Sequence, residues 1–238
     1  NSFLLFGPSE VNQGPYLGTY NSFENVPDAN CIENDGILIP QSSGSRCGFL
    51  YGPRFNLVND EESMAGHFLH ILHGKTPSDL HRKVMDVSLI LYAEHEFNAS
   101  TFTARVCAST MSDIHSCVVA AIGSLRGPLH GGANEKAMEL IENWKSKDEA
   151  KSNVLEMLNK KEKIMGFGHA VYSIRDPRNA VIKEYAKQLS ELADDNTLYL
   201  VADEVEKGMA DEKNMFANAD FFHAPAYFYL GIPTKLFT

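Results

Sequence analysis

The feature that most constrains the fold is a long succession of helix-forming segments, which begins near Asp60 and continues to the end of the sequence. Apolar residues recur there at the spacing of an amphipathic helix, as at Met64, Phe68 and Leu72. The alternating pattern of a half-buried strand is nearly absent. We therefore predict a mainly all-α fold from this point onward.

Residues that favour helix ends divide this region. Ser78, Asn134 and Asp220 are good N-caps, Asp176 suits an N-cap before Pro177, and Gly74 is a stop signal (all). The predicted helices span residues 63–73, 78–92, 101–109, 113–125, 134–144, 148–160, 177–192, 198–215 and 220–230.

Residues 1–56 have a different texture, rich in Gly, Pro, Asn and Ser and with only short apolar pieces. Turn residues every few positions predict loops and short strands there. We expect an irregular region to which we assign no chemistry.

Charge and cysteine content exclude several classes of function. The net charge of -10, from 31 acidic and 21 basic residues, disfavours nucleic acid or an anionic membrane as a partner. No apolar run is long enough to span a bilayer. The four cysteines form no CxxC pair, which favours a reducing compartment. We expect a soluble cytoplasmic protein.

The richest chemistry lies at residues 163–178. His169 follows the glycine-flanked Phe167, and Arg178 falls in the first turn of a predicted helix, where the helix dipole disfavours a cation. There its guanidinium and the positive helix end would together hold a carboxylate. The alternative is a turn with Phe167 packed in the core and Asp176 as ordinary helix punctuation.

Three further motifs carry ionisable groups. His130 lies beside two glycines, where it would donate a hydrogen bond to a carbonyl oxygen or simply fill a tight turn. His95 lies in a polar run that would form a pocket floor, or a helix end with Asn98 or Ser100 capping the next helix, and the two interpretations are compatible. Asp220 lies among aromatic residues, where desolvation would raise its pKa toward that of a general base, or it is an N-cap.

Three histidines on one predicted helix raise the question of a metal site. His67, His70 and His73 are separated by three residues each, and steps of 100° per residue spread them around the helix. We expect them to take part in amphipathic packing, and we predict no metal site.

His95, His130, His169 and Asp220 occur in this order, each inside its own motif, and together they resemble the citrate synthase family. The resemblance covers about residues 59–238. In that family the fold is helical, with a large and a small domain. The sequences EHEFNASTF, which contains His95, and KIMGFGH, which ends at His169, are most similar to those of family members that form 2-methylcitrate.

The resemblance implies an acyltransferase that condenses an acyl-CoA with oxaloacetate, giving 2-methylcitrate or citrate and free CoA. Asp220 would remove the α-proton of propionyl-CoA, which is favoured, or of acetyl-CoA. His130 would hold the thioester oxygen as the enolate forms. His169 would bind the oxaloacetate ketone and supply a proton, and His95 and Arg178 would bind oxaloacetate.

The resemblance also implies how the chain is divided. Residues 57–130 and 220–238 would belong to the large domain, and residues 131–219 would form the small CoA-binding domain. The expected partners are the two substrates and a second copy of the chain in a homodimer, and no cofactor is implied. The expected CoA-binding residues are Ile164, Gly166, Phe167, Gly168 and Lys213.

The sequence also departs from the family pattern. Family chains are usually longer, and they carry further substrate-binding arginines after the segment that matches Thr238. Ala217 replaces the usual proline before the Asn-x-Asp pattern, and His223 stands where a small residue is common. A second hypothesis is therefore a non-catalytic CoA-binding or oligomerisation module that lacks those arginines.

Overall fold

The structure is a computed structural model that describes residues 59–95 and 97–238, so the predicted irregular region at 1–56 lies outside the described residues. The described part is built of helices, with a single antiparallel bridge between Phe167 and Ala217. The all-α prediction is confirmed. No helix in the described ranges is long and apolar enough to cross a bilayer.

The helices follow one another with short connections. In chain order they are α2 (Met64–His73), α3 (Asp79–Tyr92), α4 (Ala99–Ser109), α5 (Ile114–Leu125), α6 (Ala133–Ile141), α7 (Lys147–Asn159), α8 (Pro177–Leu192), α9 (Thr197–Lys213), α10 (Ala219–Tyr229) and the 3-10 helix η2 (Thr234–Leu236).

Several predicted helix ends are confirmed by their capping contacts. The side chain of Ser78 accepts from the His81 amide at the start of α3, and Asp176 accepts from the Arg178 amide at the start of α8. Gly74 ends α2 with a left-handed backbone at φ 66°, the conformation that glycine adopts without steric cost.

Two predicted N-caps are wrong. Asn134 is buried inside α6, which begins after Gly132 without a side-chain cap, because the preceding tight turn already starts the helical backbone. Asp220 is the second residue of α10, and the side chain of Asn218 takes the capping position by accepting from the Asp220 amide. The carboxylate of Asp220 is therefore free for another contact.

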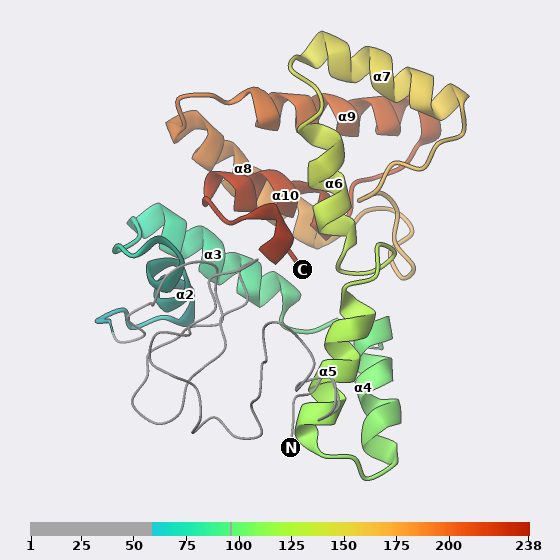
Figure 1. The fold of residues 1–238 in the computed structure, drawn as a ribbon. Coiled ribbons are helices and arrows are strands. Elements are labelled where there is room, and N and C mark those ends of the chain that lie inside the picture. The colour runs from blue at the N-terminus through green and yellow to red at the C-terminus, as the bar shows by residue number, and fades with distance from the viewer. Residues whose placement is uncertain (1–58, 96) are drawn as a thin grey trace, which may run out of the picture.

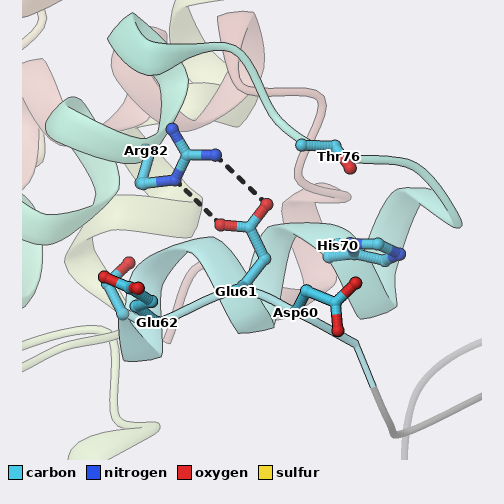
Figure 2. Close-up of a pocket in the computed structure, with 7 residues that line it drawn as sticks. Asp60, Glu61, Glu62, His70, Thr76 and Arg82 are labelled. Carbon is cyan, nitrogen blue, oxygen red and sulfur yellow. Dashed lines mark hydrogen bonds and ion pairs between the residues drawn. The ribbon is translucent and has the colours of Figure 1, made fainter.

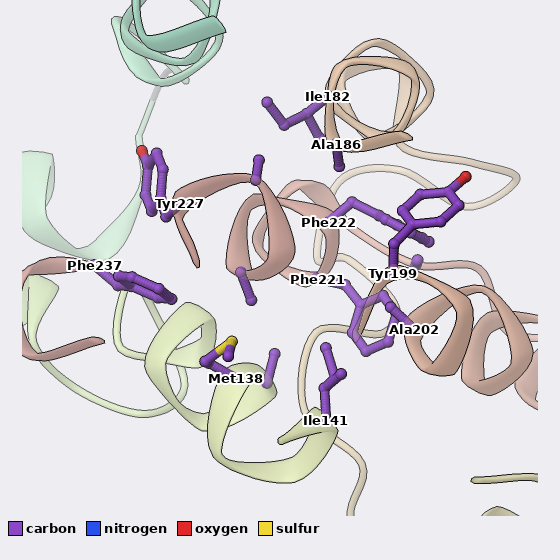
Figure 3. Close-up of a cluster of buried hydrophobic side chains, with 14 of the residues drawn as sticks. Met138, Ile141, Ile182, Ala186, Tyr199, Ala202, Phe221, Phe222, Tyr227 and Phe237 are labelled. Carbon is purple, nitrogen blue, oxygen red and sulfur yellow. The ribbon is translucent and has the colours of Figure 1, made fainter. Parts of the chain in front are cut away.

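Helix α10 forms the centre of the fold. It packs against α6, α8 and α9, and Figure 1 shows these helices around it. Figure 3 shows the core that results, in which Phe221 and Phe222 of α10 meet Met138 of α6 and Ile182 of α8. Both phenylalanines are fully buried, so the start of α10 is anchored on one side by a continuous apolar core.

Helices α4 and α5 form a hairpin at the opposite end of the molecule, at the bottom of Figure 1. They pack chiefly against each other, and neither contributes a buried residue. Large apolar side chains on the hairpin are exposed: Phe102, Val106, Ile114, Val118 and Ile122.

Candidate active site

The glycine-flanked loop at residues 166–168 is fixed against the start of α10. Gly166 and Gly168 have left-handed backbones at φ 86° and 73°, and a Cβ on Gly166 would lie 2.9 Å from atoms of Phe221. The backbone amide of Asn218 donates to the Gly166 carbonyl, and its side chain donates to the Gly168 carbonyl, each at 2.9 Å. Glycine is therefore required for this close approach.

The geometry of His169 identifies the ring nitrogen that carries its proton. Its Nδ1 accepts hydrogen bonds from the amides of Val171 at 3.0 Å and Tyr172 at 3.2 Å. Because both amides are donors, Nδ1 is unprotonated, and the neutral ring carries its proton on Nε2. Burial, followed by the charge of Arg178, lowers the pKa of His169 and keeps the ring neutral at pH 7.

His95 lies directly against His169. The two rings are stacked with centroids 4.8 Å apart, and the ring of Tyr172 packs edge-on against His95 with centroids 5.4 Å apart. The Nε2 atom of His95 is buried and has no hydrogen-bond partner among the described residues. An unsatisfied buried polar atom costs about 1 to 3 kcal/mol, so a polar ligand that supplied the missing hydrogen bond would bind favourably here.

Arg178 already holds one carboxylate, that of Asp176. Its Nε donates to Oδ1 at 3.0 Å and its Nη2 to Oδ2 at 2.8 Å. The side chain of Asp176 is fully buried, and although burial opposes ionisation, the hydrogen bonds from Arg178 hold its pKa below the usual value. Oδ2 also accepts from the Ala219 amide at 2.9 Å, so Asp176 joins the starts of α8 and α10.

The side chain of Arg178 also contacts His169. Its Nη2 lies 3.4 Å from His169 Nε2. Since Nε2 carries the ring proton, both atoms are donors, and the approach is a contact without a hydrogen bond. Two donor atoms therefore lie side by side, which suits a ligand rich in hydrogen-bond acceptors.

Asp220 is enclosed at the start of α10 and hydrogen-bonded to α3. Its Oδ1 accepts from the Tyr92 hydroxyl at 2.6 Å. Burial raises the pKa of Asp220 to about 6, and the Tyr92 hydrogen bond and the charge of Arg178 only partly offset this. A carboxylate in this range is ionised at pH 7 and a stronger base than an exposed one.

His130 makes its side-chain hydrogen bonds with Ser100 at the start of α4. Its Nε2 accepts from the Ser100 amide at 3.2 Å and also lies 2.9 Å from Ser100 Oγ. The proton of the neutral ring is therefore on Nδ1. Burial lowers the pKa of His130, which favours this neutral form. Four residues later, Asn134 Nδ2 lies 3.5 Å from the Tyr92 hydroxyl, which links this turn to Asp220.

The structure thus places the sequence-predicted residues in two linked groups. His95, His169 and Arg178 are in direct contact, and Asp176 joins them to the start of α10 and Asp220. His130 is connected to that helix only indirectly. Of the predicted CoA-binding residues, Ile164 is buried, Phe167 packs on Phe221 with centroids 4.6 Å apart, and Lys213 is exposed at the end of α9.

Sequence reasoning missed three residues of this site. Asp176 was predicted only as a cap, although its position two residues before Arg178 was a usable signal. Tyr92 was not singled out, and Ser100 was predicted only as a possible helix cap, because their partners Asp220 and His130 are 128 and 30 residues away.

A separate pocket of about 530 Å³ lies at the start of α2 and shares none of these residues. Figure 2 shows the ion pair between Glu61 and Arg82 at this pocket, with Asp60 and His70 beside it. Two histidines of α2 make hydrogen bonds within the fold: His73 Nε2 donates to the Leu230 carbonyl at 2.8 Å, and His67 Nδ1 lies 3.2 Å from Asn59 Oδ1. Within the described ranges, no group of three or more His, Cys, Asp or Glu residues is placed to hold a metal ion.

Sequence comparison finds the citrate synthase C-terminal domain over residues 47–238. The chain is 63% identical to the 2-methylcitrate synthase of Shewanella oneidensis over 187 residues, which cover 79% of the chain and 50% of that relative. It is 45% identical over 193 residues to the citrate/2-methylcitrate synthase of Bacillus subtilis, covering 77% and 52%. The chain spans about half the length of these curated relatives.

Solved structures agree with this result. The citrate synthase of Thermoplasma acidophilum, in a ternary complex with carboxymethyl coenzyme A and oxaloacetate, is 34% identical with a TM-score of 0.70, over 74% of this chain and 48% of that one. The citrate synthase of Thermotoga maritima is 36% identical with a TM-score of 0.67, over 76% and 51%. On its sequence match and its fold, the chain belongs to the citrate synthase family.

Proposed function

We propose that this chain carries the catalytic site of an acyltransferase that condenses an acyl-CoA with oxaloacetate and releases free CoA. The observation that carries the proposal lies at the start of α10, where Asp220, a half-buried carboxylate of raised pKa, is joined to the hydrogen-bond donors of His169 and Arg178. The names of the relatives and the ligands in the Thermoplasma structure point to the same substrates.

Oxaloacetate would bind at the cluster of His95, His169 and Arg178. The guanidinium has five N–H donors, and Asp176 uses two of them. The others, with the positive end of α8, would hold a substrate carboxylate. The unpartnered Nε2 of His95 would gain a hydrogen bond, and the protonated Nε2 of His169 would donate to the ketone oxygen.

The acyl-CoA would be activated by Asp220 and His130 acting together. An α-proton beside a thioester is weakly acidic, so its removal requires that the oxygen charge be stabilised at the same time. Asp220 takes the α-proton, and the Nδ1–H of His130 donates a hydrogen bond to the thioester oxygen. The turn after α5 would have to bring His130 over the acyl group, which fits its indirect link to α10 through Asn134.

Carbon–carbon bond formation follows from this geometry. The enolate carbon attacks the ketone carbon of oxaloacetate, and the ketone oxygen takes the Nε2 proton of His169 as its double bond opens. Water then adds to the thioester, the carbon–sulfur bond breaks, and CoA leaves as the thiol. The chemistry as proposed needs no metal or redox cofactor.

Binding both substrates in one site would contribute most of the rate enhancement over the uncatalysed reaction. Proximity and orientation contribute roughly 7 to 11 kcal/mol to such reactions, against about 10² to 10⁴ in rate for one proton-transfer group. We propose that residues 131–219 form a small domain that carries the CoA site, with Ile164 to Gly168 and Lys213 contacting CoA. Residues 57–130 and 220–238 would belong to the large domain, and closure of the two domains would exclude water. Because α10 shares one buried core with α6, α8 and α9, this closure would leave the contact between α8 and α10 in place.

Propionyl-CoA is the acyl donor that we favour, and the product would then be 2-methylcitrate. The support is the 63% identity to a 2-methylcitrate synthase and the phenylalanines at positions 97 and 102. Acetyl-CoA is the alternative, because one methylene in an apolar pocket changes binding by only about 1 to 3 kcal/mol.

We also propose that the protein is a homodimer joined through the α4–α5 hairpin. Ile114, Val118 and Ile122 are spaced by four residues on α5, and all three are exposed, at 73%, 49% and 54%. Spacing by four residues places them on one face of the helix, and Phe102 and Val106 extend it across α4. An apolar face of this kind is typical of an interface between subunits.

The proposal is tested by the release of CoA thiol from propionyl-CoA and acetyl-CoA in the presence of oxaloacetate. We expect turnover that prefers propionyl-CoA and falls at least about 100-fold in Asp220→Asn. Asp211→Asn, at an exposed position on α9, is the matched control. Binding of CoA without turnover in the wild-type protein would favour the non-catalytic module instead.

A further inference from the structure

Tyr92 connects the proposed base to a helix far away in sequence. It is the last residue of α3, and its hydroxyl donates to Asp220 Oδ1 at 2.6 Å. Although 38% of the residue is exposed, desolvation and the charge of Asp220 raise the pKa of Tyr92 well above 10. The hydroxyl is therefore protonated at every pH at which Asp220 ionises, and it remains a donor.

The hydrogen bond distinguishes the two carboxylate oxygens of Asp220. Oδ1 is occupied by Tyr92, and within the described part of the chain no residue donates to Oδ2. A carboxylate held through one oxygen has a fixed orientation, and its other oxygen is left as the proton acceptor. A general base must lie within hydrogen-bond reach of the proton that it removes, so this orientation matters for the rate.

His223 packs against the ring of Tyr92. It lies three residues after Asp220 on α10, it is fully buried, and its ring centroid is 4.3 Å from that of Tyr92. Its Nδ1 donates to the Ala219 carbonyl at 2.6 Å, since a carbonyl only accepts. Burial lowers the pKa of His223 to about 4, so the ring that supports Tyr92 carries no charge at pH 7.

Other ionisable groups also face Asp220. Arg178 of α8 favours its charged form, and the carboxylate of Asp176 opposes it. On α10 itself, Tyr227 is buried, and its hydroxyl is hydrogen-bonded to Ser88 of α3 at 2.6 Å instead of to Asp220. Among the tyrosines near the carboxylate, Tyr92 thus makes the direct contact.

We propose that Tyr92 is a positioning residue for the general base, that it holds Asp220 through Oδ1 so that Oδ2 removes the α-proton, and that His223 fixes the ring of Tyr92. This inference rests on the proposed function of Asp220 and deepens it. It also gives a role to His223, which replaces the small residue common in the family.

The test is the pH dependence of kcat and kcat/KM for CoA release in Tyr92→Phe. Loss of the donor destabilises the carboxylate, so we expect the acid limb to move up by roughly 0.5 to 1 pH unit. We also expect kcat to fall while the KM for oxaloacetate changes less than twofold. Tyr227→Phe is the matched control, because it removes a buried hydroxyl of the same two-helix contact, and we expect its acid limb to stay in place.

The role of His223 is tested in the same profile. His223→Ala should also raise the acid limb in the wild-type background. In the double variant, His223→Ala should not shift the acid limb beyond its position in Tyr92→Phe, because His223 acts on Asp220 through the Tyr92 hydroxyl. An equal additional shift in the double variant would overturn the part of the inference that concerns His223.

A measurement independent of turnover separates this inference from the proposed function. The carboxyl carbon of Asp220, labelled with ¹³C-aspartate and assigned by its loss in Asp220→Asn, can be titrated by NMR in wild type and Tyr92→Phe. A higher pKa in Tyr92→Phe supports the inference. An unchanged titration overturns it, even if Asp220→Asn is inactive, whereas full activity of Asp220→Asn would reject the base assignment itself.

Discussion

Helix α10 buries most of its apolar side chains, whereas the α4–α5 hairpin leaves its large apolar side chains exposed. Eight residues of α10 are buried, and the helix is surrounded by α6, α8 and α9. Neither helix of the hairpin has a buried residue. The proposed base is thus supported by a core formed within the described chain, whereas the described residues leave the apolar face of the hairpin exposed.

The largest loss of stability should come from removing a buried side chain from the core around α10. Phe222→Ala removes a fully buried ring and should lower the free energy of unfolding by about 3 to 5 kcal/mol. Phe102→Ala on the hairpin removes a ring that is 60% exposed and should cost less than about 1 kcal/mol at low protein concentration. Urea unfolding of both variants measures this, and equal costs would contradict the comparison.

Asp220 should make the core less stable than it would otherwise be. Its pKa is about 6 in the folded protein, above the unfolded value near 3.9. The folded state therefore binds more protons between these values, and stability falls as pH rises from about 4 to 6.

Asp220→Asn should thus stabilise the protein by up to about 3 kcal/mol at pH 7.5, and by much less at pH 4. The change is measured by denaturant unfolding at the two pH values, with Asp211→Asn as the exposed control. A stability gain that is the same at both pH values would argue against a raised pKa at Asp220.

A charge introduced on the apolar face of the hairpin should weaken dimerisation. Ile122→Asp places a carboxylate in the proposed interface and should weaken dimerisation at least about 100-fold, because a buried unpaired charge is strongly unfavourable. Leu192→Asp changes an equally apolar but separate residue, 75% exposed at the end of α8, and should leave the dimer intact. Analytical ultracentrifugation measures both, and a monomeric wild-type protein would reject the homodimer.

Substitution of glycines should give the smallest difference in stability between the hairpin and the region around α10. A Cβ at Gly123 of α5 meets no atom within 4 Å, so Gly123→Ala should stabilise the helix by up to about 1 kcal/mol. Gly166→Ala, at φ 86° and 2.9 Å from Phe221, should instead cost about 1 to 3 kcal/mol. Thermal unfolding measures both, and a loss at Gly123 would indicate that something already covers that face of the hairpin.

The sequence predicted those parts of the fold that depend on neighbouring residues. The helix at Pro177–Leu192 has the predicted bounds, and its cap at Asp176 is correct, because both follow from local backbone chemistry. The same logic failed at Asn134 and Asp220, where a preceding tight turn and a competing Asn218 determined the helix start.

The candidate site was predictable only as a set of separate motifs. The order of the motifs identified His95 and His169, and Arg178 was predicted from its place in the first turn of a helix. The structure brings these three side chains together. The hydrogen bond from Tyr92 to Asp220 joins residues 128 positions apart. A contact of that kind depends on how α3 packs near α10, and no local pattern encodes it.

If Asp220 removes the α-proton of the acyl-CoA, the protein should catalyse incorporation of deuterium from D₂O into the α-carbon of propionyl-CoA. Malate should replace oxaloacetate in this assay, because it has no ketone to react. We predict exchange in the wild-type protein at pH 7.5, and at least about 100-fold slower exchange in Asp220→Asn. Exchange at an equal rate in both proteins would contradict the account.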